Sequence, residues 1–279
     1  MNFKDITVGI VTFRSEKVIF RCLKSLENIR KIIILDNSND LLLKNKIKKI
    51  YPHINYILSK KNNGYGAGNN KIFRLAKTSH VLVLNPDTIL SKNCIKELIH
   101  QANLIKDKFA ILAPNENKII KKEVMEVEHV KGFSMLVNLS KIKKIKMFDE
   151  NYFLYLEEID LCKRLKSVSE KIYICGKAKI THLSAKSSNI GFEFEKCRNW
   201  HWMWSKVYYD KKFYGKIYAI KKSFFHLLKN LLKSIFFLLI LNYDKFIIFY
   251  LRFSGIYNSL IGNKSWYRPK NKLMTWKIH

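Results

Sequence analysis

Unbroken apolar runs alternate along the first half of the chain with stretches whose apolar residues recur at helical spacing. Apolar runs of this length are typical of buried strands, and helical spacing predicts amphipathic helices. Strand and helix in regular alternation predict an α/β fold with a parallel, doubly wound sheet. The predicted strands are residues 6–12, 32–35, 54–58 and 81–84, and the predicted helices are residues 16–29, a helix from Leu41, and residues 70–77.

The pattern continues to about residue 182 with shorter and less regular elements. Residues 118–128 are polar and predict a hairpin or a variable loop. The remaining predicted elements are a helix at 95–105, a strand at 109–113, a buried strand at 132–137, a basic helix at 141–146, and two short edge strands at 172–175 and 179–181.

Polar residues follow several of these strands directly. The run VLVLNPDT, residues 81–88, stops at Pro86, which cannot donate a hydrogen bond to a sheet. We expect Thr12, Asp36 and Asp87 to line one edge of the sheet, where open α/β sheets bind ligands. A carboxylate there suits Mg²⁺ or Mn²⁺, which share oxygen ligands with phosphates. The alternative is an ordinary Pro-Asp turn without a ligand.

The segment KKNNGYGAGNN, residues 60–70, places three glycines in front of a predicted helix. Glycine lets the backbone approach a ligand closely and offer amide N–H groups at a helix start. The segment lacks the Gly-Lys-Ser/Thr ending of a P-loop and the spacing of a dinucleotide fingerprint. A flexible turn remains the alternative.

A second focus is FDENYFLYLEEIDLCKR, residues 148–164, where aromatic residues precede Glu157, Glu158 and Asp160. Carboxylates this close raise one another's pKa, as a general base working near neutral pH requires. The alternative is a helix start decorated with acids that suit its dipole. His182, at the end of a predicted strand, is either a packing or capping residue or a further ligand beside Asp87.

The net charge of the chain limits the kinds of molecule that it is expected to bind. The chain has 52 Lys and Arg against 22 Asp and Glu, a net charge of +30. Such a surplus implies an anionic partner: nucleic acid, an acidic membrane or a phosphorylated substrate. Five scattered cysteines without a Cys-x-x-Cys pair indicate neither a disulfide framework nor a zinc site, and they fit a cytoplasmic setting. No export signal is visible at the amino terminus.

Taken in order, seven segments resemble the inverting nucleotide-sugar glycosyltransferases of family 2, and within them the bacterial rhamnosyltransferase-like branch. The segments are VGIVTF, LDNSND, NNGYGAGNN, VLVLNPDT, GFSMLV, FDENYFLYLEEIDLCKR and THLSAKS. The resemblance covers roughly residues 6–188. It implies a catalytic domain over residues 1–190 with the GT-A fold, a mostly parallel twisted sheet flanked by helices.

The resemblance also implies where the nucleotide sugar binds. Thr12 and Asp36 correspond to residues that hold the pyrimidine base and the ribose. Gly66, Asn69 and Asn70 correspond to a loop that closes over the nucleotide.

A divalent metal, Mg²⁺ or Mn²⁺, is implied by the same resemblance. Asn85 and Asp87 correspond to the family's Asp-x-Asp-type motif, with Asp87 as the metal ligand and Asn85 in place of an acid. His182 corresponds to a histidine that helps bind the ion or the diphosphate.

Among the acids, Glu158 corresponds to the catalytic base, and Glu157 and Asp160 would orient it. The choice of base between Glu157 and Glu158 stays open. The sequence differs from the family pattern just before this segment. Lys146 and Met147 stand where Gly-Gly commonly precedes Phe-Asp-Glu.

Residues 191–279 form a separate, basic, helical region, with seventeen Lys and Arg but four Asp and Glu from residue 192 onward. A basic amphipathic helix with an apolar, aromatic side suits an anionic membrane surface, and the apolar run at 235–241 is too short to span a bilayer. The alternatives are a helical subdomain packed on the catalytic domain, or a homodimer. The predicted polar face holds Lys222, His226, Lys229, Asn230 and Lys233, and the apolar face holds Phe224, Phe225, Leu227, Leu228, Leu231, Leu232 and Ile235.

Together these features predict an inverting glycosyltransferase on the cytoplasmic face of the membrane. It would move a sugar, with rhamnose one candidate, from a dTDP- or UDP-sugar to a hydroxyl of a lipid-linked surface glycan. One alternative is a nucleic-acid-binding protein with a basic, Trp- and Tyr-rich tail, which leaves the acidic cluster unexplained. Another is a non-catalytic family member that anchors a glycan-assembly complex.

Overall fold

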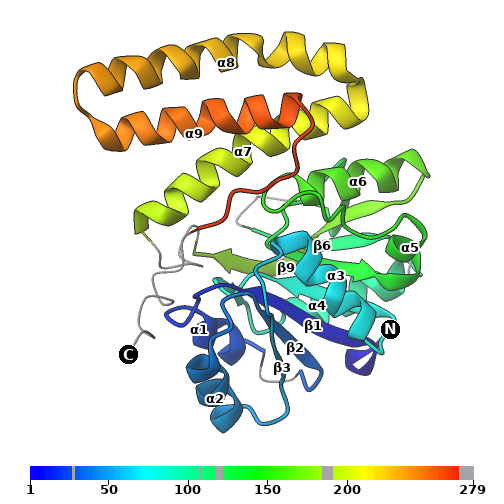
Figure 1. The fold of residues 1–279 in the computed structure, drawn as a ribbon. Helices are drawn as coiled ribbons and strands as arrows, with labels where there is room; N and C mark the ends of the chain where they lie inside the picture. The colour runs from blue at the N-terminus through cyan, green and yellow to red at the C-terminus, as the bar shows by residue number, and fades with distance from the viewer. Residues whose placement is uncertain (27–28, 107, 117–121, 184–190, 270–279) are drawn as a thin grey trace. The chain divides into compact units, whose positions relative to one another are not determined.

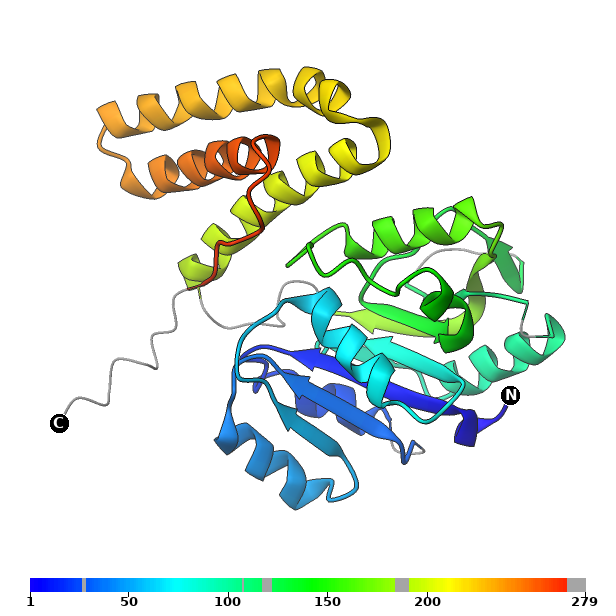
Figure 2. The same ribbon diagram turned by 45° about the vertical axis from the view of Figure 1, so that its right-hand side comes forward.

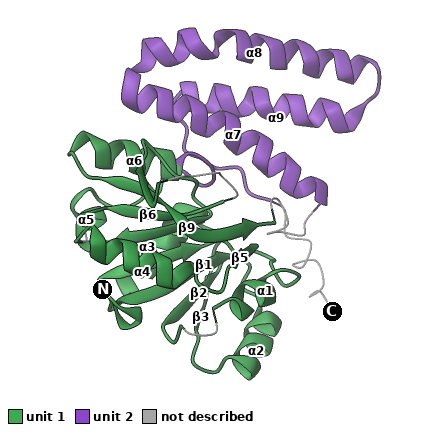
Figure 3. Cartoon of the chain, turned by 180° about the vertical axis from the view of Figure 1, so that it is seen from behind, with its two compact units in different colours: residues 1–150, 157–189 green, residues 151–156, 190–279 purple. Residues whose placement is uncertain are grey.

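A computed structural model describes residues 1–26, 29–106, 108–116, 122–183 and 191–269. Its contacts divide the chain into two compact units (Figure 3). Unit 1 comprises residues 1–150 and 157–189, and unit 2 comprises residues 151–156 and 190–279. Separate roles for the regions 1–190 and 191–279 stay a prediction. The contacts add residues 151–156 to unit 2, although the sequence pattern placed them in the first region.

The first half of the unit 1 sheet is parallel, as predicted. Its four strands lie in the order β3-β2-β1-β4, and each adjacent pair runs in the same direction (Figure 1). Because the strands are parallel, their carboxyl ends lie at one edge of the sheet. The strands are β1 (Ile6–Thr12), β2 (Ile32–Asp36), β3 (Asn55–Leu58) and β4 (His80–Leu84).

The second half of the sheet is mixed, so the doubly wound parallel arrangement predicted from strand-helix alternation holds for the first four strands alone. Strand β8 is antiparallel to both β4 and β6, β6 is parallel to β9, and β5 and β7 pair antiparallel with β9. These strands are β5 (Thr88–Leu90), β6 (Ile111–Asn115), β7 (Val124–Glu126), β8 (Ser134–Asn138) and β9 (Ile172–His182).

Strand β9 is one continuous strand, and the prediction of two separate edge strands was wrong. Its first part pairs with β6 and β7 through Cys175, and its last part, Ile180 to His182, pairs with β5. The register with β6 shifts between Cys175 and Lys179. Different partners on either side of this irregularity explain why the apolar pattern is interrupted while the strand is not.

Helices cover both faces of the sheet. One hydrophobic cluster joins α1, α2 and α4 to one face, and a second cluster joins α3, α5 and α6 to the other. The sheet is twisted in both views of Figures 1 and 2. The helices are α1 (Ile19–Lys24), shorter than the predicted 16–29, α2 (Leu41–Ile50), α3 (Tyr65–Leu75), α4 (Cys94–Leu104), α5 (Leu139–Lys144) and α6 (Glu157–Ser167); a 3-10 turn, η1, spans Phe3–Asp5.

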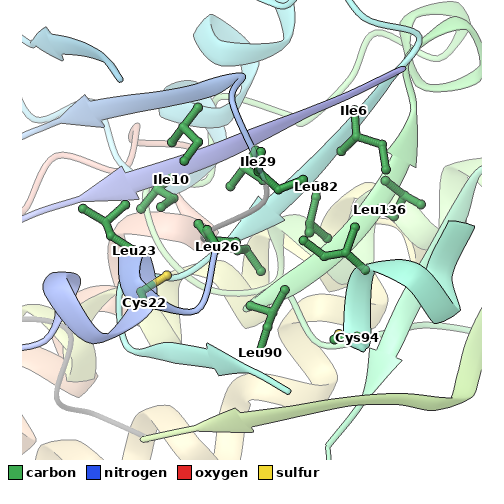
Figure 4. Close-up of a cluster of buried hydrophobic side chains, with 14 of the residues drawn as sticks. Ile6, Ile10, Cys22, Leu23, Leu26, Ile29, Leu82, Leu90, Cys94 and Leu136 are labelled. Carbon is green, nitrogen blue, oxygen red and sulfur yellow. The ribbon is translucent and has the colours of Figure 1, made fainter. Parts of the chain in front are cut away.

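Alternate residues of the central strands enter the two clusters. Ile10 and Leu82 contribute to the cluster beneath α1 and α4 (Figure 4), whereas Val81 and Val83 contribute to the other. These four side chains are almost wholly buried. Full burial of one such side chain stabilises the fold by about 1.5–3 kcal/mol.

Helix α3 begins at Tyr65, five residues before the predicted start at residue 70. Gly64, with φ of 89°, precedes the first turn, so the glycine-rich segment is largely helical. A Cβ built at Gly68 would lie 2.8 Å from a methyl carbon of Val11 on β1. The glycines therefore permit close packing of helix on sheet, and the prediction of a loop across residues 65–70 was wrong.

Unit 2 contains three long helices, α7 (Gly191–Tyr214), α8 (Lys216–Leu239) and α9 (Tyr243–Leu260). Helix α9 packs against both α7 and α8. A Cβ at Gly255 would lie 2.5 Å from the carbonyl oxygen of Trp200, so α7 and α9 cross closely at this glycine. Among the described residues, no helix has the length and apolar character to cross a bilayer.

Helix α8 buries small and polar side chains and exposes large apolar ones. Ala219, Ser223, Asn230 and Ser234 are its buried residues. Asn230 is 4% exposed and donates to the carbonyl of His226 at 2.6 Å, so its predicted place on the solvated polar face was wrong. Its exposed large apolar residues include Ile217, Phe224, Phe225, Leu228, Leu232, Ile235, Phe236 and Leu239.

Candidate active site

Buried oxygen atoms without a hydrogen bond gather where β1, β2 and β4 end. They belong to Thr12, Asn37, Asp87 and Ser134 among the described residues. Ser134 lies opposite Leu84 across the β4–β8 pairing, which places it at the same edge. Leaving such a group buried and unpaired costs about 1–3 kcal/mol. Their concentration at the edge predicted to bind ligands therefore indicates a polar binding site.

Asp36 lies at this edge, beside Thr12 in the strand register, but its carboxylate is already fully used. One oxygen accepts the backbone N–H and the hydroxyl of Ser38, and the other accepts the N–H of Asp40 at 2.9 Å and the hydroxyl of Tyr56 at 3.0 Å. A carboxylate has about four acceptor positions. The geometry thus favours a role for Asp36 in holding the β2–α2 turn, while its predicted ribose contact stays a prediction.

Asp87 is the clearest candidate for a cation ligand. Its side chain is 1% exposed, and neither oxygen has a hydrogen-bond donor among the described residues. His182 Nε2 lies 3.3 Å from Asp87 Oδ1, and the register pairs His182 with Thr88, the residue after Asp87. A buried carboxylate needs a compensating charge. Asp87 and His182 therefore fit the predicted divalent metal.

Asn85 and Glu116 complete the surroundings of this pair. The backbone of Asn85 continues the pairing with β8 by donating to the carbonyl of Phe133 at 2.8 Å. Glu116 Oε1 lies 3.8 Å from Nδ1 of His182, whose ring stacks on Phe133 at 4.4 Å between centroids. Across the described ranges, no three His, Cys, Asp or Glu side chains form a ready metal cage.

The three residues predicted to close over the nucleotide have different roles in the structure. The Asn70 side chain holds Phe148 from both sides, donating to its carbonyl at 2.9 Å and accepting from its N–H at 3.0 Å. Asn69 donates to the carbonyl of Tyr65, but its own side-chain oxygen is buried without a partner. Gly66 packs against the Cβ atoms of Phe148 and Glu157. Asn70 and Gly66 thus position the approach to α6, and Asn69 keeps an oxygen for a ligand.

Glu157 and Glu158 are the first two residues of helix α6, and their carboxyl groups lie near Tyr65 and Gly132. Burial, and then the charge of Glu158, raise the pKa of Glu157 well above its ordinary value. Burial also raises the pKa of Glu158, and backbone N–H groups, that of Gly132 among them, oppose the rise. Burial, followed by the two carboxylates, raises the pKa of the Tyr65 hydroxyl as well.

These differences separate the roles that the two glutamates can take. Glu157 is 5% exposed and has a side-chain oxygen without a partner, whereas Glu158 is only partly buried. A more accessible carboxylate whose charge is supported by N–H groups suits a general base. Glu157, whose pKa burial and the charge of Glu158 raise, suits a supporting hydrogen-bond role.

The carboxylate of Asp160, which was predicted to orient Glu158, pairs with Arg164. Its fully buried carboxylate accepts from Nε of Arg164 at 2.6 Å, and Arg164 also donates to the carbonyls of Ile145 and Met147. Lys146 and Met147 have φ of 65° and 56°, in the left-handed region that glycine favours. The Asp160–Arg164 pair therefore holds a strained turn in the place where the family commonly has Gly-Gly.

Sequence reasoning missed four residues of this site. Asn37 and Ser134 lie inside segments that were recognised, so an unpaired polar residue next to a strand end was the available signal. Tyr65 lies in the glycine-rich segment, and its contact with the acids depends on the helix start. Glu116 carried no signal in the sequence. Residues 184–187 of the THLSAKS segment lie outside the described residues.

The class that this arrangement defines is an α/β fold with a polar sheet edge and a buried acidic pair. A model of Glycosyl transferase family 2 matches residues 7–165, more than half of the chain. The chain therefore belongs to glycosyl transferase family 2.

Two curated relatives are similar over most of the chain. The low-salt glycan biosynthesis hexosyltransferase Agl10 of Haloferax volcanii is 27% identical over 207 residues, 61% of this chain and 64% of the relative. The rhamnosyltransferase WbbL of Escherichia coli K12 is 30% identical over 224 residues, 64% of this chain and 83% of the relative. The chain thus spans just under two thirds of the Haloferax protein.

Solved structures confirm the GT-A type of fold. The mannosyltransferase PcManGT of Pyrobaculum calidifontis, in complex with GDP-Man and Mn²⁺, has a TM-score of 0.59 at 9% identity, over 92% of this chain and 87% of that one. GalNAc-T7 with UDP, GalNAc and Mn²⁺ has a TM-score of 0.54 at 11% identity, over 63% of this chain and 43% of that one. At these identities the likeness concerns the fold alone.

Proposed function

We propose that this chain is an inverting glycosyltransferase that moves a hexose from a nucleoside diphosphate sugar to an acceptor hydroxyl. One observation carries the proposal: the buried Asp87 carboxylate, without a hydrogen-bond donor among the described residues, lies 3.3 Å from His182 at the ligand-binding edge of the sheet. A site of that charge and burial fits a cation shared with a diphosphate. Family membership supports the same activity.

Asp87 and His182 would hold Mg²⁺ or Mn²⁺, which when bound offsets the charge that develops on the leaving diphosphate. The buried oxygens of Thr12 and Asn37 would accept hydrogen bonds from the nucleoside. In this proposal Asp36 acts through the turn that it holds.

Glu158 is the proposed base. It takes the proton from the acceptor hydroxyl as that oxygen bonds to the anomeric carbon and the bond from this carbon to the diphosphate oxygen breaks. The nucleoside diphosphate leaves with the bonding electrons, and one displacement inverts the anomeric centre. Glu157 and Tyr65 position Glu158, while Asp160 acts through Arg164.

The proposed donor is a dTDP- or UDP-sugar, with rhamnose as one candidate because a relative is a rhamnosyltransferase. The proposed acceptor is a lipid-linked surface glycan, because a relative acts in glycan biosynthesis and the chain carries a net charge of +30. Phosphate groups on such an acceptor are attractive to a basic protein.

We also propose that the outward face of α8 lies on an anionic membrane, at its cytoplasmic side. Phe225 and Leu239 are 77% and 76% exposed, and Lys221 and Lys229 are exposed on the same helix. Apolar side chains with lysines at their borders insert at the level of anionic headgroups. A homodimer through the same face is the competing occupant.

A thermal-shift panel of UDP, dTDP, GDP, CDP and their common sugar conjugates, with and without Mn²⁺, tests the donor site. We expect a metal-dependent rise in melting temperature for UDP or dTDP compounds. Asp87→Ala should lose the metal-dependent part of the shift, and Glu128→Ala, at a strongly exposed carboxylate, should keep it. No shift with any compound would overturn the proposed function.

A further inference from the structure

Unit 2 contains an open cavity of about 560 Å³ that the proposed chemistry does not use. One face of α7 forms its main wall, because residues 191, 194, 195, 198, 199 and 202 recur at helical spacing. Tyr155, from the segment 151–156, and Arg252, from α9, complete the described lining. All described residues of the lining therefore belong to unit 2.

Two arginines supply the positive charge of this cavity. Arg198 donates through Nε to the Tyr155 hydroxyl at 2.6 Å, and Arg252 donates through Nε to the Asn199 side chain at 2.6 Å. Within the described part of the chain, neither guanidinium forms an ion pair or uses its terminal nitrogens in a hydrogen bond. Each side chain is thus fixed at Nε and keeps the paired donors that bind phosphate oxygens.

Aromatic and acidic groups accompany the arginines. Trp202 is 44% exposed and lies edge-on to Tyr155 at 5.4 Å between ring centroids. On the same helix Trp200 and Trp204 are buried in the unit 2 core, so the exposed ring of Trp202 has no packing role there. A flat apolar ring suits the face of a sugar, and the carboxylate of Glu195, which also lines the cavity, can accept hydrogen bonds from sugar hydroxyls.

From this geometry we infer that the cavity binds a glycosyl phosphate, with Arg198 and Arg252 on the phosphate and Trp202 and Glu195 on the sugar. Tyr155 lies three residues before Glu158, so an occupant of the cavity contacts the segment that leads directly into the acidic pair. Assigning this ligand to the acceptor substrate rests on the proposed function, whereas the chemistry of the cavity does not.

Calorimetric titration of the full chain in EDTA, which removes metal-dependent donor binding, tests the inference with glucose 1-phosphate as the probe. Arg198→Gln with Arg252→Gln should weaken binding at least ~10-fold, because two charge-assisted hydrogen-bond donors are lost. Lys46→Gln with Lys49→Gln, which removes two exposed charges from α2, should leave the affinity unchanged. Equal affinities for the wild type and the arginine variant would overturn the inference.

Further probes separate the parts of the ligand and its source. Trp202→Ala should weaken glucose 1-phosphate but not inorganic phosphate, and an equal effect on both would overturn the sugar assignment. A glucosyl diphosphate carrying a geranyl chain should depend on the same arginines. Tighter binding than glucose 1-phosphate supports a lipid-linked source, and equal binding supports a free sugar phosphate in the same cavity.

The donor panel keeps this inference separate from the proposed function. Arginine variants that lose glucose 1-phosphate should retain the nucleotide-dependent thermal shift. In a transfer assay they should raise the acceptor KM and leave the donor KM unchanged. A wild-type chain without any donor shift, but with arginine-dependent binding of glucose 1-phosphate, would overturn the proposed function and leave the cavity assignment standing.

Discussion

Unit 1 and helix α8 of unit 2 differ in which side chains they bury and which they expose. Unit 1 buries apolar side chains on both faces of its sheet and leaves buried polar oxygens unpaired at one edge. In unit 2, helix α8 buries Ser223, Asn230 and Ser234 and exposes most of its large apolar side chains, such as Phe225 and Leu239. The buried polar groups of α8 bond to carbonyls of their own helix, such as Ser223 to Ala219 at 2.6 Å.

This difference shows what each unit lacks. An unpaired buried oxygen is stabilised by a polar ligand, so unit 1 is incomplete at the sheet edge. An exposed apolar face is stabilised by an apolar surface, so unit 2 is incomplete along α8. Helix α8 packs against α9 and α7, and its buried side chains are small whereas most of its larger apolar side chains are exposed.

The largest expected effect concerns the acidic pair of unit 1. Glu158→Gln should leave donor binding intact and lower turnover ~10²-fold or more, the usual contribution of general base catalysis. Turnover with saturating donor and acceptor measures the effect. Glu128→Gln changes a strongly exposed carboxylate and is the matched control. Near-normal turnover in Glu158→Gln would transfer the role of base to Glu157.

A matched pair of leucines tests the contrast in burial. Leu82→Ala in unit 1 empties a fully buried position and should lower the free energy of unfolding by about 2–5 kcal/mol. Leu239→Ala in unit 2 changes a side chain that is 76% exposed, and its effect should stay within about 0.5 kcal/mol. Urea unfolding without lipid measures both. Comparable losses would mean that the α8 face is buried in solution, as in a homodimer.

Much of unit 1 could be predicted from the sequence because a strand buried on both faces leaves an unmistakable apolar run. Strands β1 and β4 were located within one residue on this basis. The antiparallel entry of β8 could not be predicted, because the apolar pattern of a buried strand is the same in either direction. The early start of α3 was missed because Gly66 and Gly68 suggest a loop by propensity, whereas here they permit tertiary packing.

The candidate site was predictable in position more than in detail. Asp87 and His182 were expected near each other, and the structure places them 3.3 Å apart. Hydrogen bonds between distant segments decided the rest: sequence cannot show that Tyr56 and Ser38 occupy the carboxylate of Asp36. Nor does helical periodicity reveal which face of α8 turns inward, because both faces obey the same period.

Lipid binding should depend on exposed α8 side chains that contribute little to the free energy of unfolding. Leu232→Gln with Leu239→Gln should weaken sedimentation with anionic liposomes ~10-fold or more, since burying each leucine contributes roughly 1.5–3 kcal/mol. Leu42→Gln, at an exposed leucine on α2 of unit 1, is the matched control and should sediment like the wild type. Unchanged sedimentation of the double variant would contradict the membrane assignment of this face.

The smallest effect is a change with pH that originates in the buried carboxyl of Glu157. Burial and the neighbouring Glu158 raise its pKa in the folded state, while its unfolded value is about 4.3. Below that value both states are protonated and the neutral carboxyl carries no penalty. As the pH rises above it, the unfolded state releases the proton first, so the folded state loses stability until the pH passes the raised folded pKa.

Glu157→Gln removes this titration, because glutamine is neutral at every pH. The stability of the variant relative to the wild type should therefore increase between pH 4 and pH 8, as measured by urea midpoints. Glu128→Gln, at an exposed carboxylate, should show no such trend. Parallel curves for Glu157→Gln and the wild type would mean that the pKa of Glu157 is not raised in the folded state, and the separate roles of Glu157 and Glu158 would then fail.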